Sequence, residues 1–357
     1  MRDPALDVLF RPWDLNPPRF DASERVIFHG VRPHPGLAMA APAQVEVVQR
    51  WQPDAGALRS AGFALASDDS DLSPGASAAL ILAGKHRDAN LAAMARLALA
   101  LEDGGQFVLS APKRSGAGRY ERAAAELFGD VEVQSKHHCR IVEAHRGPSF
   151  NRELAASWAE LDTPRQVVGG WWSRPGVFGW AKEDRGTRLL LDTLPARVGE
   201  AVADLGCGIG WISRALLERG VEVLHAVEAD ARALALCRRN LDGHTGSLAI
   251  HEGGSGELRG APGVYLHWAD ATGVLPFGAL DAVVTNPPFH DGSITDVEVG
   301  RAFLRAAVQA LRPGGRLWAV ANRKLPYEHA LYELADKVEV AVEADGFKVL
   351  TAVRRSR

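Results

Sequence analysis

AVADLGCGIGWISRALLERG, residues 201–220, runs from an apolar stretch through a glycine-rich loop into a helical pattern. Residues 201–205 predict a buried strand, because Asp204 is their one polar member. Residues 206–210 place glycine at alternate positions and predict a tight loop whose backbone lies close to a ligand. Helical periodicity begins at Trp211, and the start of a helix offers free N–H groups. The stretch therefore predicts a strand, a ligand-binding loop and a helix, which together open an α/β fold.

The spacing of the loop glycines indicates which ligand the loop suits. A Gly-x-Gly-x-Gly run lacks the third glycine position of the dinucleotide fingerprint. The carboxylate of Asp204, at the end of the strand, would repel a pyrophosphate and attract a cationic amino group. A ligand with an amino-acid moiety is therefore favoured over a dinucleotide.

Two further acids follow the next apolar stretches. Glu228 ends the predicted strand 221–228, and Asp270 follows the apolar segment 264–269. An acid at the end of the second strand typically binds ribose hydroxyls, and one after the third strand can contact an adenine amino group. Asp230 is interpreted instead as an acid at the start of a helix. With Asp204, these strand ends predict a site for an adenosine-type cofactor.

Asn286-Pro287-Pro288-Phe289, directly after the predicted strand 280–285, carries the clearest chemical signal. Two prolines fix the backbone and leave carbonyl groups without competing N–H donors. The Asn286 side-chain carbonyl and a proline carbonyl can accept both hydrogens of an exocyclic amine and aim its lone pair at an electrophile. Phe289 offers a flat face on which a base can stack. The similar run at 16–19 has Arg for the aromatic and follows no strand or glycine loop, so we assign it no site.

A weak internal repeat relates the two halves of the chain. Gly104 corresponds to Gly314 and Val131 to Val338, and these pairs are 210 and 207 residues apart. Strand and helix patterns alternate in both halves, which predicts parallel strands with crossover helices on both faces of a sheet. We therefore predict two tandem Rossmann-like domains that arose by duplication.

The predicted domain boundaries follow from this repeat. Residues 1–150 form the first domain, and residues 171–357 form the second, which carries the site. Residues 151–170 join them as a linker, in a region rich in Gly, Trp and Arg.

The first domain keeps the pattern of the fold without the pattern of the site. The position that corresponds to Asn286 falls in AGKHR, residues 83–87, with no Pro-Pro turn and no preceding glycine loop. We predict that this domain docks RNA or supports the second domain. Lys113, Arg114 and Arg119 are its candidate phosphate contacts.

Composition limits the class of protein. The chain has 357 residues, 46% of them hydrophobic and 24% charged, with a formal net charge of −3. This predicts a soluble cytoplasmic protein with no membrane segment, in which local basic patches bind any nucleic acid. Three scattered cysteines predict neither disulfides nor a metal site. His137-His138-Cys139 is expected on a strand, where neighbouring side chains point to opposite faces, so we predict no metal there.

The motifs together resemble class I S-adenosylmethionine-dependent methyltransferases of the Asn-Pro-Pro-aromatic type. More narrowly, the chain resembles the RsmC family, the small-subunit ribosomal RNA guanine-N2 methyltransferases. The narrower resemblance rests on PGVF (175–178), EDRGTRLLLDTLP (183–195), NPPFHDG (286–292), VANRKLPYEHALYE (320–333) and FKVLTAVR (347–354).

The resemblance implies a role for each matching residue. The methionine end of S-adenosylmethionine would lie against Asp204, Gly206, Cys207, Gly208 and Gly210. The ribose would lie against Glu228 and Ala229, and the adenine against Asp270 and Ala271. The target guanine would lie against Asn286, Pro287, Pro288 and Phe289, while Phe178, Gly186 and Thr187 would cap the cofactor. The implied partner is ribosomal RNA or the small ribosomal subunit.

Several alternatives stay open from the sequence. The substrate of such a site is a guanine of large-subunit ribosomal RNA, an adenine N6, a glutamine amide of a protein, or the small-subunit guanine that the resemblance implies. A non-catalytic RNA-binding assembly factor with a retained cofactor pocket is the alternative outside enzymes. The glycine-rich stretch 243–263 departs from the family and is interpreted as a surface insertion. The sequence does not distinguish a monomer from a dimer.

Overall fold

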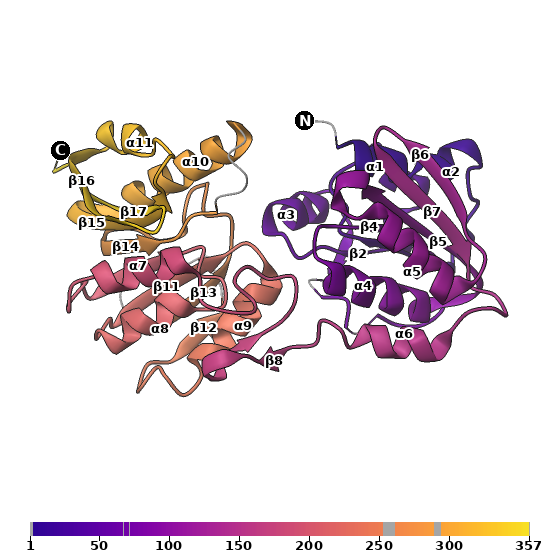
Figure 1. Ribbon diagram of the computed structural model, residues 1–357, viewed down its shortest axis with the longest axis horizontal. Helices are drawn as coiled ribbons and strands as arrows, with labels where there is room; N and C mark the ends of the chain where they lie inside the picture. The colour runs from indigo at the N-terminus through magenta and orange to yellow at the C-terminus, as the bar shows by residue number, and fades with distance from the viewer. Residues whose placement is uncertain (1–2, 67, 71, 253–260, 289–293, 357) are drawn as a thin grey trace. The chain divides into compact units, whose positions relative to one another are not determined.

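The structure is a computed structural model that describes residues 3–66, 68–70, 72–252, 261–288 and 294–356. The chain divides into two compact units. Unit 1 contains Met1–Pro164 and Arg174–Gly176, and unit 2 contains Arg165–Ser173 and Val177–Arg357. Each unit is an α/β domain built on one large sheet (Figure 1).

The sheet of unit 1 has the strand order β3-β2-β1-β4-β5-β7-β6. Its strands are β1 (Val26–His29), β2 (Val45–Val48), β3 (Ala64–Ala66), β4 (Ala76–Leu82), β5 (Leu101–Pro112), β6 (Glu132–Lys136) and β7 (Cys139–His145). The first five strands pair in parallel, and β7 is antiparallel to both β5 and β6. The central parallel strands β1 and β4 are buried on both faces, which explains their continuous apolar runs.

Helices cover both faces of this sheet. They are α1 (Pro4–Leu9), α2 (Arg11–Leu15), α3 (Gln52–Ser60), α4 (Arg87–Ala100), α5 (Ala117–Phe128) and α6 (Arg152–Ala159), with short 3₁₀ turns η1 (Pro35–Met39), η2 (Pro42–Gln44) and η3 (Lys113–Ser115). One apolar core lies between the sheet and α4, α5 and α6, and a second lies on the opposite face under α1, α2 and α3. The predicted linker residues 151–170 include α6, which packs in the first of these cores.

The sheet of unit 2 has the strand order β12-β13-β11-β10-β14-β15-β17-β16. Its strands are β10 (Ala201–Leu205), β11 (Val223–Glu228), β12 (Ile250–Glu252), β13 (Gly263–Trp268), β14 (Leu280–Thr285), β15 (Leu311–Asn322), β16 (Ala335–Ala344) and β17 (Phe347–Arg354). In this order, every pair of neighbouring strands from β12 to β15 is parallel. Strand β17 is antiparallel to both β15 and β16. The carboxyl ends of the parallel strands therefore meet at one edge.

Helices also cover both faces of the second sheet. They are α7 (Arg185–Thr193), α8 (Trp211–Glu218), α9 (Ala231–Leu241), α10 (Ile294–Ala310) and α11 (Glu328–Tyr332). A separate small hairpin of β8 (Arg165–Gln166) and β9 (Trp172–Ser173) encloses the 3₁₀ turn η4 (Val168–Gly170). The α7, α8 and α9 side encloses one apolar core, and the α10 and α11 side encloses another.

The two sheets share an order of seven strands. Starting from β3 and β13, each runs through four more parallel strands and ends in an antiparallel pair. The eighth strand of unit 2, β12, comes from the stretch 243–263, so part of the predicted surface insertion adds an edge strand. The predicted α/β class, with parallel strands and helices on both faces, is confirmed.

His137 and His138 lie in a different local structure from the predicted one. They form the turn of the β6–β7 hairpin, with φ of 50° and 59°, so the prediction that they lie on a strand is wrong. Both residues take the left-handed conformation that a two-residue hairpin turn requires. Among the described residues, no group of His, Cys, Asp and Glu is arranged to hold a metal ion.

The described part of the chain contains no helix with the length and apolar character needed to cross a membrane. All three cysteines are buried and free.

Candidate active site at the strand ends of unit 2

The glycine loop lies between β10 and α8, as predicted. Gly206, Gly208 and Gly210 have φ of 73°, 55° and 98°, a conformation that favours glycine. The amides of Gly206 and Cys207 both donate to the carbonyl of Val227, at 2.8 and 3.0 Å. This joins the loop to the neighbouring strand β11 and fixes its position at the edge of the sheet.

The three loop glycines differ in what surrounds them. A Cβ at Gly210 would lie 3.0 Å from the Sγ of Cys237, and one at Gly206 would lie 3.3 Å from the ring of Phe303. At Gly208, no atom of the described residues lies within 4 Å of the corresponding position. A side chain at Gly206 or Gly210 would therefore crowd a packed neighbour, whereas Gly208 faces open space in which a ligand can approach the backbone.

Asp204 is fully buried at the end of β10. Its Oδ2 accepts a hydrogen bond from the Oγ of Ser213 on α8 at 2.6 Å, while its Oδ1 has no hydrogen-bond partner in the described part of the chain. Burial raises the pKa of this carboxyl to about 7. An unpartnered buried acceptor with a raised pKa fits a nearby cationic amino group, because a positive charge would stabilise the ionised form.

The raised pKa gives a testable pH dependence of stability. The folded chain binds a proton at Asp204 more tightly than the unfolded chain, so its stabilising effect is present at low pH and is lost as the pH rises towards 7. Between pH 5 and pH 8, wild type should lose about 3 kcal/mol of unfolding free energy relative to Asp204→Asn. Urea unfolding of both proteins at the two pH values measures this difference. Parallel pH profiles would contradict the assignment.

Glu228 ends β11 and folds back over the glycine loop. Its carboxylate accepts from the amides of Gly208, Ala229 and Asp230, at 2.9, 2.8 and 2.9 Å. Burial raises the pKa of this carboxyl, and the three backbone donors oppose that shift. Asp230 caps α9 by accepting from the amide of Arg232 at 3.0 Å, as its interpretation as a helix-start acid predicts.

Asp270 follows β13 at the same edge. Its Oδ1 accepts from the amide and the hydroxyl of Thr272, at 2.8 and 2.7 Å, which forms a tight local turn. Ala271 beside it is buried. The amide of Ala269 donates to the carbonyl of Glu228, so the ends of β11 and β13 are held together.

Asn286 follows β14 and is held by the start of α7. Its Nδ2 donates to the Oδ2 of Asp184 at 3.1 Å and to the Oγ1 of Thr187 at 2.9 Å. A carboxylate oxygen can only accept, so the amide nitrogen must face α7 and the amide oxygen must be its acceptor on the other side. Asp184 also caps α7 through the amide of Thr187 at 3.0 Å.

The contact with Asp184 was not predicted from the sequence. Asp184 and Asn286 are 102 residues apart in the chain, and the one local signal is that Asp184 stands three residues before Thr187, as a helix cap does. A Cβ at Gly186 would lie 2.9 Å from the Oδ2 of Asp184, so glycine allows α7 to start at this point. Of the two α7 residues predicted to cap a cofactor, Thr187 contacts Asn286, and Gly186 lies beside Asp184 and Phe347.

The remaining predicted residues are less informative. Pro287 is buried and Pro288 is half-buried behind Asn286. Phe178 lies in the connection between β9 and α7 with 63% of its surface exposed. Phe289 lies outside the described residues. In unit 1, Asn16 is the C-cap of α2, so the run at 16–19 follows a helix.

Comparisons with known proteins identify the family. Residues 170–351 match the family model of the methyltransferase small domain. The chain is 33% identical to ribosomal RNA small subunit methyltransferase C of Chromohalobacter salexigens, over 73% of each chain. It is 32% identical to the Pseudomonas aeruginosa protein of the same name, over 77% of this chain and 79% of the relative.

A solved structure has a similar fold along nearly the whole chain. The Thermus thermophilus 16S rRNA N2 G1207 methyltransferase, solved in complex with AdoMet and guanosine, covers 99% of this chain with a TM-score of 0.78 at 24% identity, and 92% of that chain is matched. The family model covers the glycine loop, the acidic strand ends and Asn286. The chain belongs to the ribosomal RNA small subunit methyltransferase C family.

Proposed function

We propose that this protein transfers a methyl group from S-adenosylmethionine to the exocyclic N2 of a guanine in small-subunit ribosomal RNA. The observation that carries the proposal is the orientation of Asn286, whose amide nitrogen is bound by Asp184 and Thr187. This orientation leaves an amide oxygen as the acceptor for an exocyclic amine. The names of the relatives, and the guanosine in the Thermus thermophilus complex, support a guanine of small-subunit RNA.

S-adenosylmethionine supplies an electrophilic methyl group, and the residues of unit 2 bind and orient both reactants. Asn286 and a proline carbonyl after it accept the two hydrogens of the guanine N2. These two hydrogen bonds favour a pyramidal nitrogen and direct its lone pair towards the methyl group. The protein therefore contributes to the reaction by positioning the base and by electrostatic stabilisation. As the methyl carbon passes to the nitrogen, its bond to the sulfonium sulfur would break and a thioether would leave, and the nitrogen would lose one proton to water. The guanine must leave its base stack to reach this edge.

The residues proposed to bind the cofactor lie along the same edge of the sheet as Asn286. We propose that Asp204, Gly206, Cys207, Gly208 and Gly210 hold the methionine end. Glu228 and Ala229 hold the ribose, and Asp270 and Ala271 the adenine. Phe178, with Gly186 and Thr187, closes the site from the side of α7. The open space at Gly208 and the unpartnered oxygen of Asp204 support this arrangement.

Gly208→Ala tests the loop assignment. The new methyl group would meet no protein atom, so the folding cost is the left-handed backbone strain alone, about 1 kcal/mol. It would occupy the space proposed for the cofactor, and we expect at least tenfold weaker binding of S-adenosylmethionine by calorimetry. Gly220→Ala is the matched control, with φ of 79° and equally open surroundings at the end of α8. Equal affinities of the two variants would refute the assignment.

The function itself is tested by methyl transfer to ribosomal subunits. Separated small and large subunits from cells that lack this protein are incubated with labelled S-adenosylmethionine, and the nucleosides are analysed. Label in N2-methylguanosine of small-subunit RNA is the expected result. Label in large-subunit RNA would show that the target lies in the large subunit. Label in N6-methyladenosine or in protein would show that the substrate is an adenine or a protein amide. Cofactor binding without any label would favour a non-catalytic assembly factor.

We further propose that the two units arose by duplication and that residues 1–150 are a methyltransferase-like domain without a site. The shared order of seven strands supports this origin. Strands β4 and β14 hold the same place in the two sheets. Asn286 and Pro287 follow β14, whereas Ala83 and Gly84 follow β4 in unit 1.

A further inference from the structure

The side chain of Asn240, on α9, joins the glycine loop to the β8–β9 hairpin. Asn240 is 6% exposed, and its Oδ1 accepts from the amide of Trp172 at 2.7 Å. Its Nδ2 donates to the carbonyl of Trp172 and to the carbonyl of Ile209 in the glycine loop, both at 2.9 Å. The amide oxygen and both amide hydrogens are therefore used, which requires a side chain with a donor and an acceptor at one end.

The glycine loop depends on such bonds, because its own sequence leaves the backbone free. Ile209 lies between Gly208 and Gly210, and glycine loses more conformational freedom on folding than any other residue. The Ile209 side chain is 1% exposed and packs in a small apolar cluster with residues of α9. Asn240 then fixes the direction of the Ile209 carbonyl. A loop that already has its bound shape binds a ligand more tightly, since less freedom is lost on binding.

Helix α9 and the hairpin both contact the loop at further points. Cys237 lies one turn before Asn240 on α9, and its Sγ is the atom that a Cβ at Gly210 would approach to 3.0 Å. The ring of Trp171, from the hairpin, packs on that of Trp211, the first residue of α8, with 3.8 Å between the ring centroids. The loop is thus enclosed by α9 on one side and linked to the hairpin where α8 begins.

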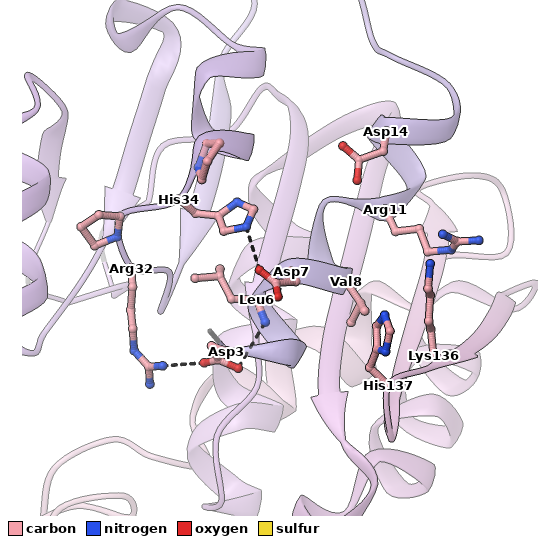
Figure 2. Close-up of a pocket in the computed structure, with 12 residues that line it drawn as sticks. Asp3, Leu6, Asp7, Val8, Arg11, Asp14, Arg32, His34, Lys136 and His137 are labelled. Carbon is pink, nitrogen blue, oxygen red and sulfur yellow. Dashed lines mark hydrogen bonds and ion pairs between the residues drawn. The ribbon is translucent and has the colours of Figure 1, made fainter. Parts of the chain in front are cut away.

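The loop at the same place in unit 1 is held in a different way (Figure 2). It follows β1, which has the place of β10 in the strand order. Arg32 in this loop pairs with Asp3, and the Nε2 of His34 lies 3.2 Å from the Oδ1 of Asp7. These four residues line a hollow of about 750 Å³, and the side chains of Arg32 and Asp7 are 51% and 39% exposed. Exposed pairs of this kind stabilise little, so the buried amide of Asn240 is not a general feature of the fold.

We propose that Asn240 is a positioning residue for cofactor binding, and that it acts on the shape of the glycine loop through the Ile209 carbonyl. The inference rests on the proposed function, because it takes this loop to hold the methionine end of S-adenosylmethionine. Asn240 is not among the residues proposed to contact either reactant, and the bonds of the loop to Val227 and Glu228 do not involve it. A change at Asn240 therefore weakens the binding of the methionine end and leaves that of the ribose and adenine.

The test uses two ligands and two variants of Asn240 in the full chain. Asn240→Asp keeps an acceptor for the Trp172 amide and removes both N–H donors, whereas Asn240→Ala removes all three bonds without adding a charge. The ligands are S-adenosylmethionine and 5′-methylthioadenosine, which has the same ribose and adenine but no amino-acid end. Calorimetry gives Kd for each ligand, and single-turnover methyl transfer to small-subunit ribosomal RNA gives the rate at saturating cofactor.

Asn90→Asp is the matched control in unit 1. Asn90 is also 6% exposed, and its side chain accepts from the amide of Gly84 at 3.0 Å and donates to the carbonyl of Gly84 at 2.9 Å. Its Nδ2 also donates to the hydroxyl of Tyr120. The control thus loses the same kinds of bond at the same burial, in a unit to which no site is assigned. We expect a lower melting temperature and wild-type affinity for both ligands.

For both Asn240 variants we expect about tenfold weaker binding of S-adenosylmethionine and less than a threefold change for 5′-methylthioadenosine. The single-turnover rate at saturating cofactor should stay within threefold of wild type, because the contacts of Asn286 are unchanged. If the buried carboxylate of Asn240→Asp prevents folding, Asn240→Ala decides the outcome.

Three results would overturn the proposal. They are wild-type affinity of Asn240→Ala, an equal loss of affinity for the two ligands, and an equal loss in Asn90→Asp. Each would show that Asn240 stabilises the fold without positioning the loop. A wild-type protein that does not bind S-adenosylmethionine would instead overturn the proposed function.

Discussion

Asn286→Ala is expected to lower kcat for methyl transfer by about 10²–10³-fold, the usual cost of removing one group that stabilises a transition state. The variant loses the acceptor proposed for the guanine amine. The glycine loop stays intact, because its hydrogen bonds run to Val227 and Glu228. Single-turnover transfer and calorimetry with S-adenosylmethionine separate the two effects. Near-full activity of the variant would show that the site is wrongly assigned.

Thr187→Val is the matched variant for this prediction. It keeps the size of the side chain and removes the hydroxyl that accepts from the Nδ2 of Asn286. We expect a smaller loss of kcat, about tenfold, because Asp184 still holds the amide. A loss as large as that of Asn286→Ala would mean that Thr187 itself contacts a reactant.

Asp162→Ala is expected to destabilise unit 1 by about 3–5 kcal/mol, the cost of removing one partner from buried ion pairs. Asp162 is 1% exposed and binds Arg96 and Arg174 at 2.6 and 2.7 Å. Both guanidinium groups are themselves buried or nearly so, and each would keep one remaining carboxylate, on Asp69 or Asp68. Urea unfolding measures the loss.

Glu46→Ala is the control for the buried network. Glu46 pairs with Arg25 at 3.4 Å in the same unit, but both side chains are about a quarter exposed. Removing such a pair should cost less than 1 kcal/mol. If Asp162→Ala cost no more than Glu46→Ala, the buried network would not contribute to the stability of unit 1.

The sequence predicted the local parts of the site well. The strands β10 and β14 have the predicted bounds, and the glycine loop, the acid at the end of β11 and the cap at Asp230 lie where expected. Each of these features is encoded within a few residues, by apolar runs, glycine spacing or a capping side chain.

Contacts between distant segments could not be predicted in the same way. The orientation of Asn286 depends on Asp184, and the network of Asp162 joins α4, the segment after β3 and Arg174. No periodicity relates such residues, because their proximity is set by the packing of the sheet and its helices. The turn at His137 and His138 was missed for another reason, since neither residue is a usual turn former.

The path of the chain around Arg174 limits how the protein can be divided into fragments. The chain enters unit 2 at Arg165, returns to unit 1 for Arg174–Gly176 and then continues in unit 2. A fragment that begins at Arg165 would carry Arg174 without Asp68 and Asp162, and a fragment that ends at Pro164 would keep the two carboxylates without that arginine. The two domains of this protein are therefore separate compact units but are not independent modules for expression or domain exchange.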